Sequence, residues 1–444
     1  MTVRYITVTP LANFFKPATR AFGDVAVVGG AAAAATGPKK VAVPITNPDS
    51  VSYTAATTLT AAATAAATTV AVQSAAGFPT NLPFAVQIEQ ETLSVTAVAG
   101  LNWTVTRGAN GTTAAAHALG ATVTFGFKGL PVDDPTLFQG DLGNAVREVF
   151  SQSPGPSLVW AVQTDTADGA DAVKNALAVV GKLDVQIVVV ANTPLSTANK
   201  TALQGLVDHV QTVSSTGGDG KERIGVVMLS KGAAPPAGAD DLSLSAPRVV
   251  FVAHKSDGDA AAAVAGTIAG YTPSTSLLLK PVNLAMADTF TDDEILAFDT
   301  ARIDWLTRPT LLPGGGLYMG EGYIRGDPKL SPYIDIIRTI DDVSFRLKAQ
   351  LIQSIGVLRI TRPGLRTLSA QMAAVLEPLK QGEVIDAYDV FMPLLVLLDK
   401  DPSTLLPVEA QEIKNARDSR TVEAIVAVTY AGAIHRLNIT LKFQ

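Results

Sequence analysis

The chain has 444 residues, of which 47% are hydrophobic and 17% charged, with a formal net charge of −6 and no cysteine. The length is enough for roughly two to four domains. The missing cysteines exclude disulfides and thiolate metal sites, and an acidic balance without any Lys/Arg-rich run argues against nucleic-acid binding. For a soluble protein this composition is apolar, so we expect much of the surface to be covered in an assembly.

No targeting or membrane segment is predicted. The sequence begins Met-Thr-Val-Arg-Tyr, without the apolar core of a signal peptide. No run of about 18 or more strongly apolar residues occurs, and the Ala/Thr tract at 55–71 is too polar to span a bilayer. We therefore expect a soluble protein that is made in the cytosol, assembles with other copies and does not insert into a membrane.

The first two strands are predicted within the first thirty residues. Residues 1–9 are strand formers stopped by Pro10, and taken alone they are most simply the first strand of a local sheet. Residues 24–29 (Asp-Val-Ala-Val-Val-Gly) predict a buried strand that ends at a glycine turn. The Gly29-Gly30 pair lacks the lysine and Ser/Thr of a phosphate-binding loop, so it is not assigned to one.

Residues 50–128 differ in kind from the rest and predict a small all-β domain. Alanine and threonine dominate as far as Thr69, and Asn110-Gly111 is a strong turn signal. Short strands are expected at Val70–Gln73, Phe84–Ile88, Thr92–Val98, Trp103–Thr106 and Thr122–Phe127. Glu89, Glu91, Arg107 and His117 could be mistaken for a catalytic or metal set, but we expect them to be solvated surface side chains.

Residues 129–328 alternate between strand and helix patterns, which predicts a layered α/β domain of βαβ type. The expected strands are Leu158–Gln163, Val185–Ala191, Ile224–Leu229 and Arg248–His254. The expected helices are Asp168–Val180, Ser196–Val213 and Asp257–Ala269. Asp168, Ser256 and Asp257 are interpreted as helix caps, and Thr291 with Glu294 as a capping box.

Such a domain invites an enzyme hypothesis, because open α/β sheets bind ligands at the carboxyl ends of their strands. Asp165 with Lys231 or His254 could form an acid/base site there. Against this, no dinucleotide fingerprint, nucleophile elbow or Walker lysine follows any strand, and His209 and His435 have no second metal ligand nearby. We therefore predict no catalytic residue, no metal and no cofactor, and keep a nucleotide-binding or hydrolytic α/β enzyme as an alternative.

The last third predicts two helices. Ser331-Pro332 is a helix start, after which apolar residues recur at roughly helical spacing while charged residues fall largely elsewhere on the wheel. The apolar set is Tyr333, Ile337, Ile340, Leu347, Leu351 and Ile355, and the polar set is Asp335, Arg338, Asp341, Asp342, Arg346 and Lys348. A second helix should run from Thr367 to about Lys380, where Pro378 should fray or end it.

The end of the chain predicts extended structure. From Asp386 the period changes, and Tyr388, Val390, Phe391 and Leu394 to Leu398 are expected to be extended and buried. Pro407 to Arg417 is expected to be a short polar helix. Thr421 to Tyr430 and Ile434 to Phe443 are expected to pair as a hairpin across residues 431–433. In the final run Leu437, Ile439, Leu441 and Phe443 alternate with polar residues, which is typical of a strand with one dry face.

These residues carry two resemblances. The helix with Asp-Ile-Ile-Arg-Thr-Ile-Asp-Asp (335–342), the following Arg-Ile-Thr-Arg-Pro-Gly (359–364) and the terminal hairpin resemble the C-terminal domain of contractile tail sheath proteins from phages and related injection systems, over about residues 320–444. Gly-Phe-Pro (77–79), Val-Gln-Ile-Glu-Gln-Glu (86–91), residues 103–112 and His117 are similar to a small β-module inserted in many phage structural proteins.

The sheath resemblance implies a non-enzymatic, α+β multidomain protein whose copies stack as six-fold helical layers round an inner tube and contract to drive that tube through an envelope. Its partners would be further copies, the tube protein, and baseplate and tail-terminator proteins, in a virion tail or injection particle assembled in the host cytoplasm. The expected parts are an N-terminal arm strand (1–20), the α/β domain (21–49 and 129–328), the inserted surface domain (50–128), a tube-proximal C-terminal domain (329–420) and a hairpin or arm (421–444).

The resemblance also implies roles for particular residues. Links between subunits by β-augmentation are assigned to Val3, Tyr5, Ile6, Val8, Leu437, Ile439, Leu441 and Phe443. Residues that could face the tube are Arg338, Asp342, Arg346, Glu412, Lys414 and Arg417, for which a solvated helix face or internal ion pairs is the alternative. A different tail or baseplate structural protein remains the other alternative function.

Overall fold

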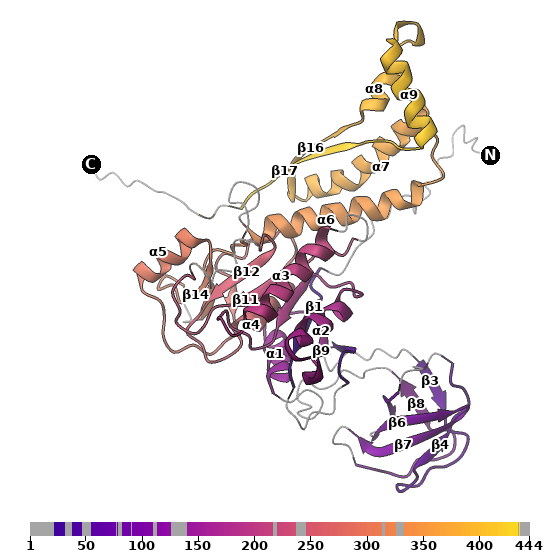
Figure 1. The fold of residues 1–444 in the computed structure, drawn as a ribbon, viewed down its shortest axis with the longest axis vertical. Coiled ribbons are helices and arrows are strands. Elements are labelled where there is room, and N and C mark those ends of the chain that lie inside the picture. Colours follow the sequence, from indigo (N-terminus) through magenta and orange to yellow (C-terminus); the bar gives the residue numbers. More distant parts are fainter. Residues whose placement is uncertain are drawn as a thin grey trace, which may run out of the picture.

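The computed structural model describes residues 22–31, 38–46, 55–76, 78, 82–89, 91–109, 113–125, 140–215, 220–236, 246–312, 316–325, 333–433 and 435. These residues form three parts that are stacked along the long axis of the molecule (Figure 1): an all-β part, an α/β part and a C-terminal part. In the described residues no helix has both the length and the apolar character needed to cross a bilayer.

The α/β part is built on a nine-stranded sheet with the order β13-β15-β14-β12-β11-β10-β1-β9-β2. The six strands from β14 to β9 are parallel, and antiparallel strands complete both edges. The strands are β1 (Val25–Gly29), β2 (Ala42–Thr46), β9 (Leu158–Gln163), β10 (Ile187–Val190), β11 (Ile224–Met228), β12 (Val249–Ala253), β13 (Pro281–Val282), β14 (Asp304–Thr307) and β15 (Leu317–Met319).

Helices cover both faces of this sheet, which is why its central strands are apolar at every position. In β1, Val25 and Val27 pack with α1 (Asp141–Phe150) and α4 (Ala260–Gly270). Ala26 and Val28 face the other side, where the core includes residues of α2, α3 and α5. These helices are α2 (Ala172–Val180), α3 (Lys200–Ser215) and α5 (Asp292–Ala301).

The strands predicted for this domain are present within one or two residues of their expected bounds, but the three predicted caps Asp168, Ser256 and Asp257 are wrong. The N-cap of α4 is Asp259, whose carboxylate accepts from the Ala262 amide. A 3-10 turn, η1 (Thr166–Asp171), precedes α2 and is capped by Asp165. The capping box of Thr291 and Glu294 is confirmed at the start of α5. Helices α2, α3 and α4 each start a few residues later than their patterns suggest, because short turns precede them.

The all-β part is a six-stranded antiparallel sheet with the order β3-β8-β5-β6-β7-β4. Its strands are β3 (Ala55–Thr58), β4 (Thr69–Ala71), β5 (Phe84–Ile88), β6 (Glu91–Ala99), β7 (Asn102–Ala109) and β8 (Thr122–Phe125). It has its own core, in which Phe78 and Phe84 meet the fully buried Trp103 edge to face. It lies at the opposite end of the molecule from the C-terminal helices (Figure 1).

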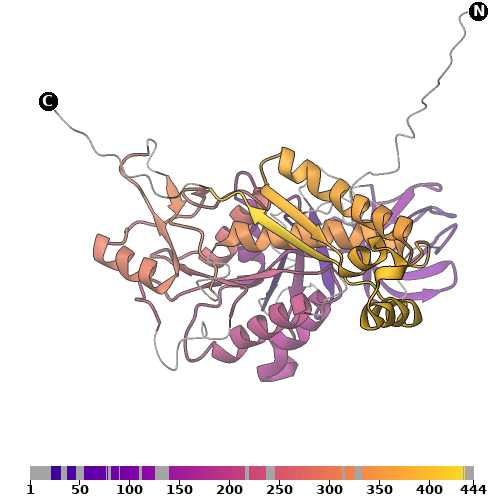
Figure 2. The same cartoon turned by 90° about the horizontal axis from the view of Figure 1, so that it is seen from above.

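The C-terminal part consists of helices around a two-stranded sheet. Its elements are α6 (Ile334–Leu351), η4 (Ile352–Ser354), α7 (Arg362–Gln381), β16 (Ile385–Phe391), α8 (Pro393–Asp399), η5 (Pro402–Thr404), α9 (Pro407–Ser419) and β17 (Ile425–Tyr430). The long helix α6 lies between the α/β part and the rest of the C-terminal part (Figure 1). Seen from above, β16 and β17 cross over α6 and α7 (Figure 2).

Three expectations for this part need correction. Residues 394–398 form helix α8 instead of extended chain, because Pro393 supplies a helical first position and a short apolar run does not by itself define the period. Pro378 does not end α7, which continues to Gln381 with Leu376 and Leu379 buried. The strand expected at Thr421 to Tyr430 pairs antiparallel with β16. Apart from His435, its expected partner, 434–443, lies outside the described residues.

Candidate assembly surfaces and buried polar clusters

The two-stranded sheet of β16 and β17 is the first candidate surface. Tyr388, Val390 and Val426 point inward and pack with residues of α6 and α7. Phe391 and Ile425 lie opposite each other on the outer side and are 46% and 49% exposed. In the described part of the chain each strand has only the other as its neighbour. A sheet with two uncovered edges and a partly apolar outer face can accept further strands.

The residues predicted to supply such strands lie outside the described residues. They are Val3, Tyr5, Ile6, Val8, Leu437, Ile439, Leu441 and Phe443. The structure describes the chain from Phe22, where the N-terminal segment joins the α/β part, to His435, where the C-terminal segment leaves the C-terminal part. The assignment of these residues to links between subunits therefore stays a prediction.

Five of the six predicted tube-facing residues fall into two groups. Glu412, Lys414 and Arg417 are exposed on α9, whose one buried residue is Ile413. Asp342 and Arg346 of α6 form an ion pair with each other, Nε to Oδ2 2.8 Å, and are only partly exposed. The charges of α9 are thus available to a partner molecule.

Arg338 of α6, the sixth of these residues, is an interior residue in this chain. It is only 5% exposed, and its guanidinium donates to the carbonyl oxygens of Phe22 and Tyr271, both at 2.9 Å. Because these backbone groups occupy it, Arg338 is placed inside the protein and not on a surface open to a tube.

Part of the charged face of α6 packs against the α/β part, where its side chains form the internal ion pairs that were the alternative to tube contacts. Arg248 of the α/β part binds Asp341 with two hydrogen bonds of 2.7 and 2.8 Å, and Lys348 pairs with Glu222. Ile340, by contrast, is 48% exposed. The prediction that α6 packs through its apolar residues alone is therefore wrong in part. The surface against which α6 packs is itself polar and pairs with the charged side chains of the helix.

The residues of the enzyme hypothesis have structural roles. Asp165 caps η1 and binds Lys39 at 3.1 Å, and Lys231 pairs with Asp257 at 2.5 Å. His254 is buried between the Leu229 carbonyl oxygen and the Ser256 amide, and its burial lowers its pKa. No group of three or more His, Cys, Asp or Glu side chains in the described ranges could hold a metal ion.

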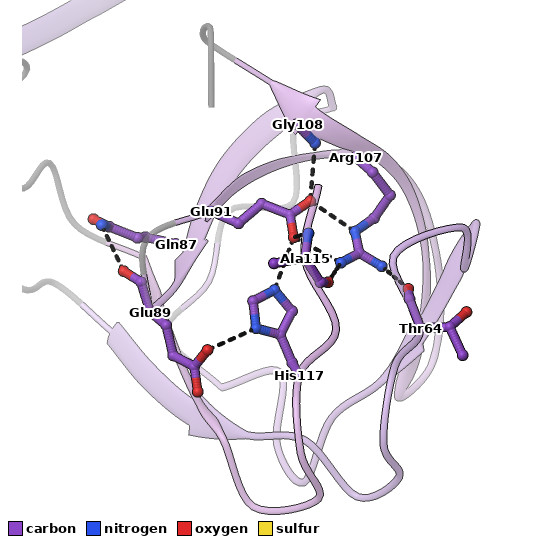
Figure 3. A network of polar contacts seen from close by, with 8 residues as sticks. All are labelled: Thr64, Gln87, Glu89, Glu91, Arg107, Gly108, Ala115 and His117. Carbon is purple, nitrogen blue, oxygen red and sulfur yellow. Dashed lines mark hydrogen bonds and ion pairs between the residues drawn. The ribbon is translucent and has the colours of Figure 1, made fainter. Parts of the chain in front are cut away.

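A polar cluster in the all-β part was missed from the sequence. Glu91 is 1% exposed, and its carboxylate accepts hydrogen bonds from Arg107 at 2.6 and 2.8 Å and from the amides of Gly108 and Ala115. His117 lies between Glu91 at 2.8 Å and Glu89 at 3.1 Å (Figure 3). Arg107 also donates to the carbonyl oxygens of Thr64 and Ala115, so the cluster ties three loops to β6 and β7.

The expectation that this set is solvated is wrong for Glu91, Arg107 and His117, and only Glu89 is exposed. Strand alternation is the signal that could have found it, because Glu91 shares the inward face of β6 with Leu93 and Val95. Burial alone would raise the pKa of Glu91, but the hydrogen bonds from Arg107, Ala115, Gly108 and His117 outweigh it and lower the pKa to about 2. Both oxygens are occupied, so the cluster holds structure and offers no open ligand position.

The fold of the chain is that of contractile sheath proteins. Two of the solved structures that share it are each 12% identical to this chain. One is the helical sheath of the anti-feeding prophage in its contracted state, with a TM-score of 0.55, covering 100% of this chain and 99% of that chain. The other is the sheath complex of the extracellular contractile injection system PVC in its contracted state, with a TM-score of 0.57, covering 100% and 98%.

The sheath resemblance seen in the sequence is thus confirmed at the level of the fold. Both neighbours are sheath proteins in their contracted state. No protein-family model matches the chain, and no curated protein matches its sequence.

Proposed function

We propose that this chain is the structural subunit of a contractile tail sheath. Its copies would polymerise as six-fold helical layers round an inner tube, and contraction of the array would drive the tube through a target envelope. The observation that carries the proposal is a fold shared over the whole length of the chain with two sheath proteins, despite 12% identity. A helical array of identical subunits requires head-to-tail contacts, which an exchanged segment can supply.

The links between subunits are assigned to the two terminal segments and the two-stranded sheet. Residues 1–9 and the alternating run ending at Phe443 are strand formers, and β16 and β17 each leave one edge uncovered in the described residues. Main-chain pairing of a neighbour's arm with such an edge would join subunits with little dependence on side chains. The apolar side of the arm (Leu437, Ile439, Leu441 and Phe443) would lie beside Phe391 and Ile425.

Strand links of this kind suit a sheath because the joined sheet can move as a unit while the chain bends where each arm begins. The domains can then slide and rotate during contraction without loss of the lattice. The exposed charges Glu412, Lys414 and Arg417 on α9 are assigned to the tube, and the all-β part to the outside of the particle. Baseplate and tail-terminator proteins would close the two ends of an array assembled in the host cytoplasm.

Electron microscopy of the purified full chain tests the proposal. We expect hollow, helically striated tubes, and their loss when residues 1–9 are removed. The melting temperature of the truncated chain should equal that of the full chain, which would show that the missing tubes reflect a lost link and not unfolding. Well-behaved monomers from the full chain under all conditions would overturn the sheath proposal.

A further inference from the structure

One turn of α6 contacts the described ends of both terminal segments. Arg338 donates from Nη2 to the carbonyl oxygens of Phe22 and Tyr271, both at 2.9 Å. Phe22 is the residue at which the N-terminal segment joins the α/β part, and Tyr271 follows α4. The Arg338 guanidinium therefore links the chain just before β1 to the chain just after α4.

The same turn of α6 holds the C-terminal segment. Asp335, one turn before Arg338, accepts a hydrogen bond of 2.6 Å from the hydroxyl of Tyr430 at the end of β17. Five residues later His435 packs edge to face on Tyr333, the N-cap of α6, with ring centres 4.6 Å apart. Its ring nitrogens lie 3.0 Å from Glu321 Oε2 and 2.9 Å from Ser276 Oγ.

The side chains that make these contacts are buried, and their charges interact with one another. Asp335 is 3% and Arg338 5% exposed, and the side chain of His435 is 12% exposed. Burial lowers the pKa of Arg338 to about 10, while the negative charges of Asp341, Asp342 and Asp335 oppose that change. Burial and the hydrogen bond to Asp335 both raise the pKa of Tyr430. Asp335 therefore attracts Arg338 and binds Tyr430 in a region that water does not screen.

We propose that Tyr333, Asp335 and Arg338, which we call the root clamp, couple the two arms of one subunit, so that displacement of one arm loosens the attachment of the other. The proposal rests on the proposed function, because it assigns the arms to links with neighbouring subunits. If the two arms join different neighbours, the clamp transmits a change at one link through α6 to the next. Neighbouring links would then change together instead of one at a time.

A root clamp differs physically from two independent anchors. Arg338 is needed to keep Phe22 in place, and Asp335 is needed to keep Tyr430 in place, but both side chains project from a single helical turn, at positions i and i+3. Loss of either contact leaves a buried polar group without its partner on that turn, so the turn must shift or admit water. We call Phe22 and residues 430–435 the roots of the N-terminal and C-terminal arms. A shift of the turn, or the entry of water, would also weaken the contact that holds the other root.

Hydrogen exchange on the unassembled full chain, after sedimentation of any tubes, tests the clamp. The variants are Arg338→Gln, which releases Phe22, and Tyr430→Phe, which removes only one hydroxyl. The controls are Arg346→Gln, two turns further along α6, and Tyr388→Phe on the neighbouring strand β16, which loses an exposed hydroxyl hydrogen bond to Glu377 of α7. We expect each test variant to speed exchange on the order of tenfold at both residues 22–28 and residues 425–435, and the controls to do neither.

Two results would overturn the root clamp. The first is faster exchange in only one of the two stretches, 22–28 or 425–435, namely the one whose contact the variant removes. The second is exchange in Tyr430→Phe equal to that of the unaltered chain. Tyr430→Phe removes no packing, so it keeps the test decisive even if Arg338→Gln fails to fold. Because exchange is read on single subunits, this outcome is independent of whether tubes form. Failure of the sheath proposal would instead appear as the absence of tubes from the unaltered chain.

Discussion

Two buried carboxylates have pKa values shifted in opposite directions, and the difference lies in their hydrogen-bond donors. The Glu91 carboxylate accepts hydrogen bonds from a guanidinium, two backbone amides and an imidazole, and these keep it ionised despite its burial. Asp304 is 1% exposed and receives only amides, those of Trp305 and Glu321 on Oδ1, while no hydrogen bond reaches its Oδ2 from the described residues. Burial therefore dominates for Asp304 and raises its pKa to about 6.

Glu91→Gln should destabilise the all-β part by about 3 kcal/mol at pH 7, because Arg107 would stay buried without a counter-charge. Since the folded pKa of about 2 lies below the ordinary value of 4.5, the contribution of the ionised Glu91 is lost as pH falls from about 4.5 towards 2. Hydrogen exchange of β6 in the full chain, followed against pH, measures both effects. Glu89→Gln, at the exposed end of the cluster, is the control and should leave β6 unchanged.

Asp304→Asn should stabilise the α/β part at pH 8 by about 2 kcal/mol, because the folded chain no longer has to ionise a buried acid. Folded Asp304 keeps its proton up to about pH 6, whereas the unfolded chain releases it near 3.8, so its favourable contribution is lost as pH rises through 6. Melting curves at pH 4 and pH 8 should show the gain only at pH 8. An equal gain at both values, or a gain from Asp288→Asn on the surface, would contradict this explanation.

At the level of elements, the sequence predicts most strands and helices but not what the faces of α6 contact. The strand at 158–163 has the expected bounds because both faces of a parallel sheet are apolar, and the signal is local. The helical-wheel prediction for α6 was wrong because Asp335, Arg338 and Asp341 are buried against polar partners that lie between 67 and 316 residues away in the sequence. Such partners have no local signature, and the pairing of β17 with β16 was missed for the same reason.

Asp341→Asn should weaken the attachment of α6 to the α/β part by about 3 kcal/mol, because Arg248 loses a two-point ion pair in a mostly buried position. Asp342→Asn is the matched control, since its carboxylate pairs with Arg346 one turn away on the same helix. A pair of that kind contributes about 0.5 kcal/mol. Chemical denaturation of the two variants measures the difference. Equal losses from both would mean that the ion pair with Arg248 does not hold α6 in place.

In the whole molecule, α6 is the element on which the α/β part and the sheet of β16 and β17 meet. It lies between the α/β part and the sheet of β16 and β17, and its first turns reach the roots of both terminal segments (Figure 1). Among the described residues, the core of the all-β part is made entirely of residues between 59 and 125 and includes none from α6. The division into parts follows from composition in the sequence, whereas the central place of α6 follows only from contacts between distant residues.

Removal of residues 50–128 should therefore leave the rest of the chain folded and able to form tubes. The first and last strands of the all-β part pair with each other, with Ala55 opposite Phe125, so the chain enters and leaves that part side by side and a short Gly/Ser linker can replace it. We expect the melting temperature of the remaining domains to change by less than about 3 °C, the shift that roughly 1 kcal/mol produces. Microscopy should show tubes of smaller outer diameter with the same striation. A folded deletion variant that forms no tubes would mean that the all-β part takes part in the lattice, contrary to its proposed place on the outside.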